Sequence, residues 1–201
     1  MSAPAYRPDI DGLRAWAVLS VLVYHVNPQL LSGGFLGVDI FFVISGYLIS
    51  LIIFRELARG ELSFAHFYAR RIRRLLPVST LVLVAAAIIT AVVLPPLTHE
   101  SIAGDIRSAA LWVSNWHFAA GATQYMSDTQ ASPVLHYWSL SLEEQFYVVW
   151  PLLIVLVVRT LPRWGEMGRR RLATVLAAVL GGSLMLSLLM TSSAGPWAYF
   201  G

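Results

Sequence analysis

The stretch FLGVDIFFVISGYLISLIIF, Phe35 to Phe54, decides the fold class because its twenty residues contain a single charge, Asp39. An α-helix of about twenty residues crosses the roughly 30 Å of hydrocarbon in a bilayer. Comparable apolar runs occur along the chain, and the complete set is Leu13 to Val26, Phe35 to Phe54, Leu75 to Leu94, Trp138 to Val158 and Leu172 to Met190. We therefore predict an all-α, polytopic membrane helix bundle with about five transmembrane helices.

The composition agrees with a membrane protein and narrows the classes of function. Hydrophobic residues make up 57% of the 201 residues and charged residues only 12%, which is too few to cover a soluble domain of this size. The chain has no cysteine, which excludes disulfides and cysteine-ligated metals, and we expect no metal site. The net charge of +3 comes from arginines that lie mostly between the apolar runs. We therefore expect membrane lipid as a partner and no nucleic acid.

Two arginine-rich connections set the predicted topology. Short loops rich in positive charge stay in the cytosol, so we place Arg55 to Arg74 and Arg159 to Arg171 there, together with the N-terminus. The segment Pro95 to Tyr137 is then extracytoplasmic. Within it, the run Ile106 to Ala120 begins and ends on the same side, and its tryptophans favour one interfacial or re-entrant helix. We expect a multi-pass membrane protein with its N-terminus in the cytosol.

Two ionisable residues in the first apolar run are the leading functional candidates. Arg14 and His25 are eleven residues apart, which places them about 16 Å apart along a helix axis and on nearly the same face. Ionisable residues inside a membrane helix are costly and mark functional sites. The alternative is that Arg14 anchors the cytosolic end of the helix and that His25 is a polar residue of the interface.

Three carboxylates are candidates to work with a histidine. Asp39 lies near the start of the second run, and Glu143 and Glu144 lie one to two turns into the fourth, with Tyr147 on the same helix face as Glu143. A carboxylate orients an imidazole and stabilises its protonated form, as general-base catalysis or acyl transfer requires. The alternative for the glutamates is a capping role at a helix N-terminus, where acids are favourable.

Arginine fills four of the five positions from Arg70 to Arg74. At a membrane surface such a cluster binds lipid headgroups. As a functional site it binds the phosphates of a cytosolic donor, because guanidinium groups make bidentate phosphate contacts. Arg71 and Arg74 are three residues apart, which puts them on one side of the incoming helix.

Four segments occur together in a characteristic order and spacing. They are Tyr6 to Ala15 with the spacing from Arg14 to His25, Gly33 to Tyr47, the pair Arg71 and Arg74, and Trp138 to Tyr147. Together they resemble the acyltransferase-3 family of bacterial membrane O-acyltransferases, and the resemblance covers essentially the whole chain. The N-terminal segment is most similar to members that carry a periplasmic SGNH-type esterase domain.

The resemblance implies transfer of an acyl group, usually acetyl, from cytosolic acyl-CoA to a hydroxyl of an extracytoplasmic carbohydrate such as lipopolysaccharide or peptidoglycan. It also implies roles for individual residues. His25 and Glu143 would be catalytic, Asp39 is a further catalytic candidate, and Arg14, Arg71 and Arg74 would bind the donor. With the predicted topology, the arginine cluster lies on the cytosolic side and His25 with Glu143 on the outer side.

The resemblance also bears on domain organisation. The family's membrane domain has further spans, so we expect residues 1–201 to form its N-terminal half, with no soluble domain. The C-terminal half or an SGNH domain would then be a partner. Two other interpretations stay open, a non-catalytic membrane subunit or inactive fragment, and a small-molecule transporter that uses the buried charges as a path. A transporter is expected to show internal repeats, and none is visible in the sequence.

Overall fold

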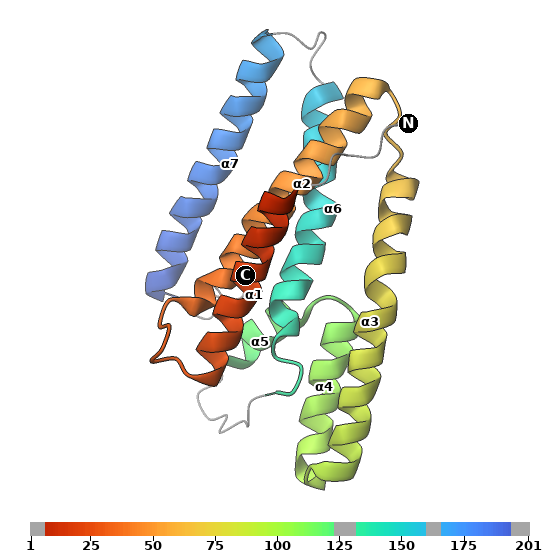
Figure 1. Cartoon of the computed structure of the whole chain (residues 1–201), viewed down its shortest axis with the longest axis vertical. Coiled ribbons are helices and arrows are strands. Elements are labelled where there is room, and N and C mark those ends of the chain that lie inside the picture. The colour runs from red at the N-terminus through yellow and green to blue at the C-terminus, as the bar shows by residue number, and fades with distance from the viewer. Residues whose placement is uncertain (1–6, 123–131, 160–165, 194–201) are drawn as a thin grey trace. The chain divides into compact units, whose positions relative to one another are not determined.

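The computed structural model describes residues 7–122, 132–159 and 166–193. Its contacts divide the chain into two compact units, Met1–Leu62 and Ser63–Gly201. Within the described ranges every regular element is a helix, as Figure 1 shows. The predicted all-α fold class is therefore confirmed.

The first unit contains α1 (Pro8–Val26), the short helix η1 (Gly34–Leu36) and α2 (Gly37–Arg59). Pro8 starts α1, a position where its missing N–H costs nothing. Asn27 ends the helix in an extended conformation, and its side chain accepts a hydrogen bond from Gln29 N at 3.0 Å. The predicted end of the first helix is confirmed.

Two glycines let α1 and the start of α2 touch at the backbone. A Cβ atom on Gly34 would lie 2.3 Å from Ser20 O, and one on Gly37 would lie 2.4 Å from Ala17 O. Ala17 itself is completely buried. Small residues that allow close backbone approach are typical of helix pairs in membranes, where dispersion contacts replace the hydrophobic effect. These contacts place the first turn of α2 beside the last three turns of α1.

The second unit contains α3 (Phe64–Val93), η2 (Pro96–Thr98), α4 (His99–Ala110), α5 (Ser114–Ala122), α6 (Tyr137–Arg159) and α7 (Glu166–Ser193). Its long helices α3 and α6 run antiparallel. Near the start of α3, Tyr68 donates a hydrogen bond to Tyr147 O at 3.2 Å, and further along, Ser79 O accepts one from Tyr137 at 3.0 Å. A small buried core of Leu83, Ala109, Val134 and Tyr137 joins α3, α4 and the start of α6.

Four helical segments of the described chain are long and apolar enough to cross a membrane, Gly34–Arg59, Phe64–Val93, Tyr137–Val158 and Ala173–Thr191. They contain the second and fourth predicted runs and all but one residue of the third and of the fifth. The protein is a multi-pass membrane protein. The predicted run Leu13 to Val26 lies in α1, which also carries Asp9, Asp11 and Arg14 and does not meet the same criterion. Its crossing stays a prediction.

The first arginine-rich connection is mostly helical, so its prediction as a loop is wrong. Helix α2 continues to Arg59 and ends at Gly60, whose φ of 68° is the left-handed conformation that favours glycine. Ser63 then starts α3 by accepting a hydrogen bond from His66 N at 3.3 Å. No glycine or proline lies between Ser63 and Pro77, and arginine favours helix. The second predicted loop is helical at both ends, and residues 160–165 lie outside the described ranges.

The predicted single helix from Ile106 to Ala120 is also wrong, because the structure has two helices there. Helix α4 ends at Ala110 and α5 begins at Ser114. Trp112 takes a left-handed φ of 58°, and Val113 N donates to Ser108 O at 3.0 Å, a helix ending that usually uses glycine. Figure 1 shows α4 turning back alongside the C-terminal half of α3.

Candidate functional site

The strongest charge cluster of the second unit joins α3 to α6. The Arg71 guanidinium donates from Nε to both carboxylate oxygens of Glu144 at 3.0 Å and from Nη2 to Oε1 at 2.6 Å. The same Nη2 lies 3.9 Å from Glu143 Oε1. Both glutamates lie about two turns inside α6, beyond its first turn, so the capping alternative is wrong.

Tyr147 completes this cluster. Its ring centroid lies 3.0 Å from the guanidinium carbon of Arg71, and its hydroxyl donates a hydrogen bond to Glu143 Oε1. The predicted proximity of Glu143 and Tyr147 is confirmed. The side chains of Arg71, Glu143 and Glu144 are 20%, 22% and 19% exposed. We call Arg71, Glu143, Glu144 and Tyr147 the Arg71 cluster; in it Arg71 pairs with Glu144, as charges within membrane helices generally pair.

The cluster overturns one expectation from the sequence. Arg71 and Glu143 were predicted on opposite sides of the membrane, but their side chains lie at one level of the second unit. The reason is that α3 begins at Phe64, so Arg71 is already two turns inside it. Tyr137, the first residue of α6, lies beside Ser79 in the middle of α3, so the second turn of the antiparallel α6 comes to lie beside Arg71. The long Arg71 and Glu144 side chains then bridge the two helices.

A second polar network, between α5 and α6, was missed from the sequence. Ser114, Asn115 and Ser141 are completely buried, and the two serine hydroxyls are 2.7 Å apart. Gln145 donates to Asn115 Oδ1 and to Trp112 O, both at 2.9 Å, and accepts from Asn115 Nδ2 at 3.3 Å. The only sequence signal was Ser141 and Gln145 at helical spacing within an apolar run.

This network fixes the rotation of α6 about its own axis. Ser141 and Gln145 point towards α5, while Glu144, the residue before Gln145, points towards α3. Turning α6 by one residue would leave buried amide and hydroxyl groups without partners, which costs about 1 to 3 kcal/mol each. The α5 contacts therefore hold the acid pair facing Arg71.

His25 lies in the last turn of α1 in the first unit, on the same helix as Arg14, as predicted. Its Nδ1 is 2.8 Å from Val21 O. Because a carbonyl oxygen only accepts, Nδ1 carries a proton in this hydrogen bond, and Nε2 is left outside it. The ring also packs edge-on against Tyr24, with centroids 5.7 Å apart. His25 is thus an exposed imidazole held through Nδ1.

Asp39 lies in the first turn of α2. The contacts of Gly34 and Gly37 with α1 bring this turn to the same end of the first unit as His25. No hydrogen bond joins Asp39 to His25 within the described residues. Arg14 is half-buried about three turns before His25, and its role stays a prediction.

An ion pair ties down the start of α1. Arg7 Nη2 lies 2.7 Å from Asp9 Oδ2, and Arg7 also donates to the Tyr47 hydroxyl of α2 at 3.5 Å. The hydrogen bond from Arg7 lowers the pKa of the Asp9 carboxyl to about 2. Both side chains are exposed, so this pair orients the N-terminal segment without adding much stability.

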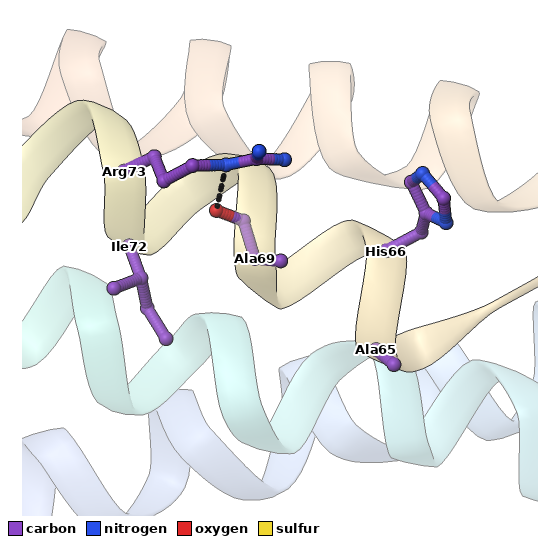
Figure 2. Close-up of a pocket in the computed structure, with 5 residues that line it drawn as sticks. All are labelled: Ala65, His66, Ala69, Ile72 and Arg73. Carbon is purple, nitrogen blue, oxygen red and sulfur yellow. Dashed lines mark hydrogen bonds between the residues drawn. The ribbon is translucent and has the colours of Figure 1, made fainter.

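The arginines of α3 differ in what they contact. Arg73 folds back along its helix and donates from Nε to Ala69 O at 3.1 Å. It borders an open groove of about 610 Å³ lined by Ala65, His66, Ala69, Ile72 and Arg73, which Figure 2 shows. Arg71 lies on the other side of the helix. Arg74 is exposed and forms no ion pair within the described part of the chain.

These features define a multi-pass helical membrane protein with a paired charge cluster between its helices. Residues 7–201 match the family model described as an acyltransferase domain. The chain belongs to this family, the acyltransferase-3 family that the sequence resembled. No solved structure matches the chain.

Curated relatives agree with the family. Over 159 residues the chain is 41% identical to "O-acetyltransferase OatA" of Staphylococcus aureus strain NCTC 8325 / PS 47, covering 79% of this chain and 26% of the relative. Over 194 residues it is 40% identical to "Putative peptidoglycan O-acetyltransferase YrhL" of Bacillus subtilis strain 168, covering 95% of this chain and 30% of the relative. The chain thus spans between a quarter and a third of the length of these relatives.

Proposed function

We propose that this chain forms part of a membrane O-acyltransferase that moves an acetyl group from cytosolic acetyl-CoA to a hydroxyl of a cell-envelope carbohydrate. Membership of the acyltransferase-3 family over residues 7–201 is the observation that carries the proposal. The printed names of OatA and YrhL support acetyl as the group, and that of YrhL makes peptidoglycan the first acceptor to test. We place the protein in the bacterial cytoplasmic membrane with its N-terminus in the cytosol.

His25 Nε2 is the reacting atom in this proposal. In direct transfer it takes the proton of the acceptor hydroxyl, whose oxygen attacks the thioester carbonyl. The C–S bond then breaks, and the CoA thiolate leaves and takes up that proton. In the two-step route Nε2 attacks the thioester carbonyl first, the C–S bond breaks and the CoA thiolate leaves. The acceptor oxygen then attacks the acyl carbon, the bond from Nε2 to that carbon breaks, and the hydroxyl proton is taken up by the thiolate. Both routes use Nε2, the ring nitrogen that the hydrogen bond to the Val21 carbonyl leaves available.

The roles proposed for the other charged residues follow from the sign of their charge. Asp39 and Glu143 are proposed as the catalytic acids, with Glu143 at the level of Arg71, and Arg14 with the arginines of α3 as the donor-binding groups. The donor carries phosphates, and guanidinium groups recognise them by charge-assisted hydrogen bonds. The C-terminal half of the family domain, or an SGNH domain, is the proposed protein partner.

A complementation experiment tests the proposal. The chain is expressed in a bacterial strain that lacks its own envelope O-acetylation, and base-labile acetate on purified peptidoglycan is measured. His25→Ala is compared with His99→Ala, a matched control because His99 Nε2 also bonds a backbone carbonyl, Leu94 O at 2.9 Å. At equal membrane abundance, the wild-type chain and His99→Ala are expected to restore acetate, and His25→Ala is not.

Two results would count against the proposal. Acetylation by His25→Ala at the wild-type level would remove Nε2 from the chemistry. Absence of acetate with the wild-type chain as well would show that these 201 residues do not act alone on peptidoglycan.

A further inference from the structure

The two arginines expected to bind the donor have different surroundings, and the difference assigns them different tasks. Arg71 is 20% exposed and uses Nε and Nη2 on Glu144. Its planar face is covered by the Tyr147 ring. Arg74, one turn further along α3, is exposed on the surface of the unit.

The charge around Arg71 argues against a phosphate there. One guanidinium faces two carboxylates, Glu143 and Glu144. A phosphate that took over Arg71 would leave Glu144 largely buried without its bidentate partner, and breaking a buried pair in this way is strongly unfavourable. The phosphate would also approach two negatively charged carboxylates. A phosphate bound at Arg74 would incur neither of these costs.

We infer that Arg71 is a positioning residue that holds Glu144, and through Tyr147 also Glu143, in place, and that Arg74 makes the contact with the anionic donor. This inference rests on the proposed function and divides its donor-binding arginines. Arg71 acts on the acids of α6 together with the α5 network, which holds the same stretch of helix from the other side. The Arg71 cluster is therefore held by contacts from both neighbouring helices.

A charge swap tests the assignment to Arg71. Arg71→Glu and Glu144→Arg each break the ion pair between Arg71 and Glu144, one by changing the base and the other by changing the acid. The double variant Arg71→Glu/Glu144→Arg restores an ion pair with the two charges exchanged. Arg74→Glu is the matched control, because it makes the same charge change three residues away. All variants are made in the whole chain and compared by unfolding midpoint in detergent, by coenzyme A binding through tryptophan fluorescence, and by acetyl transfer.

We expect both single variants at the Arg71 to Glu144 pair to unfold at lower temperature and the double variant to recover. Arg71→Glu should keep coenzyme A binding within about threefold of wild type, while Arg74→Glu weakens it about tenfold or more, the loss of one charge-assisted contact. Acetyl transfer should fall in Arg71→Glu and return in the double variant, with an unchanged KM for acetyl-CoA.

Two results would overturn the inference. In the first, Arg71→Glu weakens coenzyme A binding as much as Arg74→Glu does, and the swap does not restore stability. In the second, the wild-type chain does not bind coenzyme A, which would remove the donor role of Arg74. Failure of acetyl transfer alone, with binding and the stability recovery intact, would contradict the proposed function and leave the division between the two arginines standing.

Discussion

Replacement of Gly37 by alanine should loosen the helix pair that carries His25. The new Cβ would lie 2.4 Å from Ala17 O and 2.7 Å from Val21 Cγ2. A carbon and a carbonyl oxygen approach to about 3.3 Å at closest, so α1 and α2 must separate by roughly 0.9 Å. A gap of that size forfeits between a quarter and a half of the dispersion energy of each contact. Overpacking of this kind costs about 1 to 3 kcal/mol.

The upper end of that range applies because the obstructing atom belongs to the backbone and cannot rotate away. Gly12→Ala is the matched control, since a Cβ there meets nothing within 4 Å. In α1 that change should stabilise by up to about 1 kcal/mol, the difference in helix propensity. The assay is the unfolding midpoint of the purified chain in detergent. Equal midpoints for Gly37→Ala and Gly12→Ala would refute the close backbone contact.

Three further outcomes are expected. Gln145→Leu and Asn115→Leu should each destabilise by about 1 to 3 kcal/mol through an orphaned buried amide, and the double variant should cost less than their sum in a thermal double-mutant cycle. Ser63→Ala should lower the free energy of unfolding by about 1 kcal/mol, because it removes the N-cap of α3. Ser63→Thr keeps a capping hydroxyl and should retain most of that stability in the same thermal unfolding assay. Arg7→Ala should raise the Asp9 pKa from about 2 towards its ordinary value near 4, measured by NMR titration. Because the Asp9 pKa is lowered, the contribution of its pair with Arg7 is present above pH of about 4 and is lost as pH falls towards 2; an unchanged titration in Arg7→Ala would contradict the pairing.

Hydrophobic runs predicted the long helices well because length and apolarity are local properties of the chain. The second to fifth runs each lie within a candidate span except for at most one residue at an end. The helix of Arg14 and His25 was also predicted, including its end at Val26. The helix boundaries at the arginine-rich segments were not predicted correctly. Charge marks a segment as cytosolic, but arginine is also a good helix former, so it does not show where a helix starts.

The sequence singled out the members of the Arg71 cluster but not their arrangement. Glu143 and Glu144 stood out as acids within an apolar run, and Arg71 as part of an arginine-rich segment. That Arg71 meets Glu144 depends on the antiparallel register of α3 and α6, which is set by contacts 73 residues apart in sequence. The end of α4 near Trp112 was not predicted for a similar reason. It depends on a hydrogen bond from Gln145 of α6 to Trp112 O, and no glycine in the local sequence indicates it.

The role of His25 in acetyl transfer can be tested in a chimera in which this chain replaces the matching segment of B. subtilis YrhL, with which it shares 40% identity over 194 residues. The chimera is expressed in cells lacking YrhL and other envelope O-acetylation, and acetate on peptidoglycan is quantified. We expect acetylation by the chimera and none by its His25→Ala form at equal abundance. Acetylation that persists in the His25→Ala chimera would contradict it.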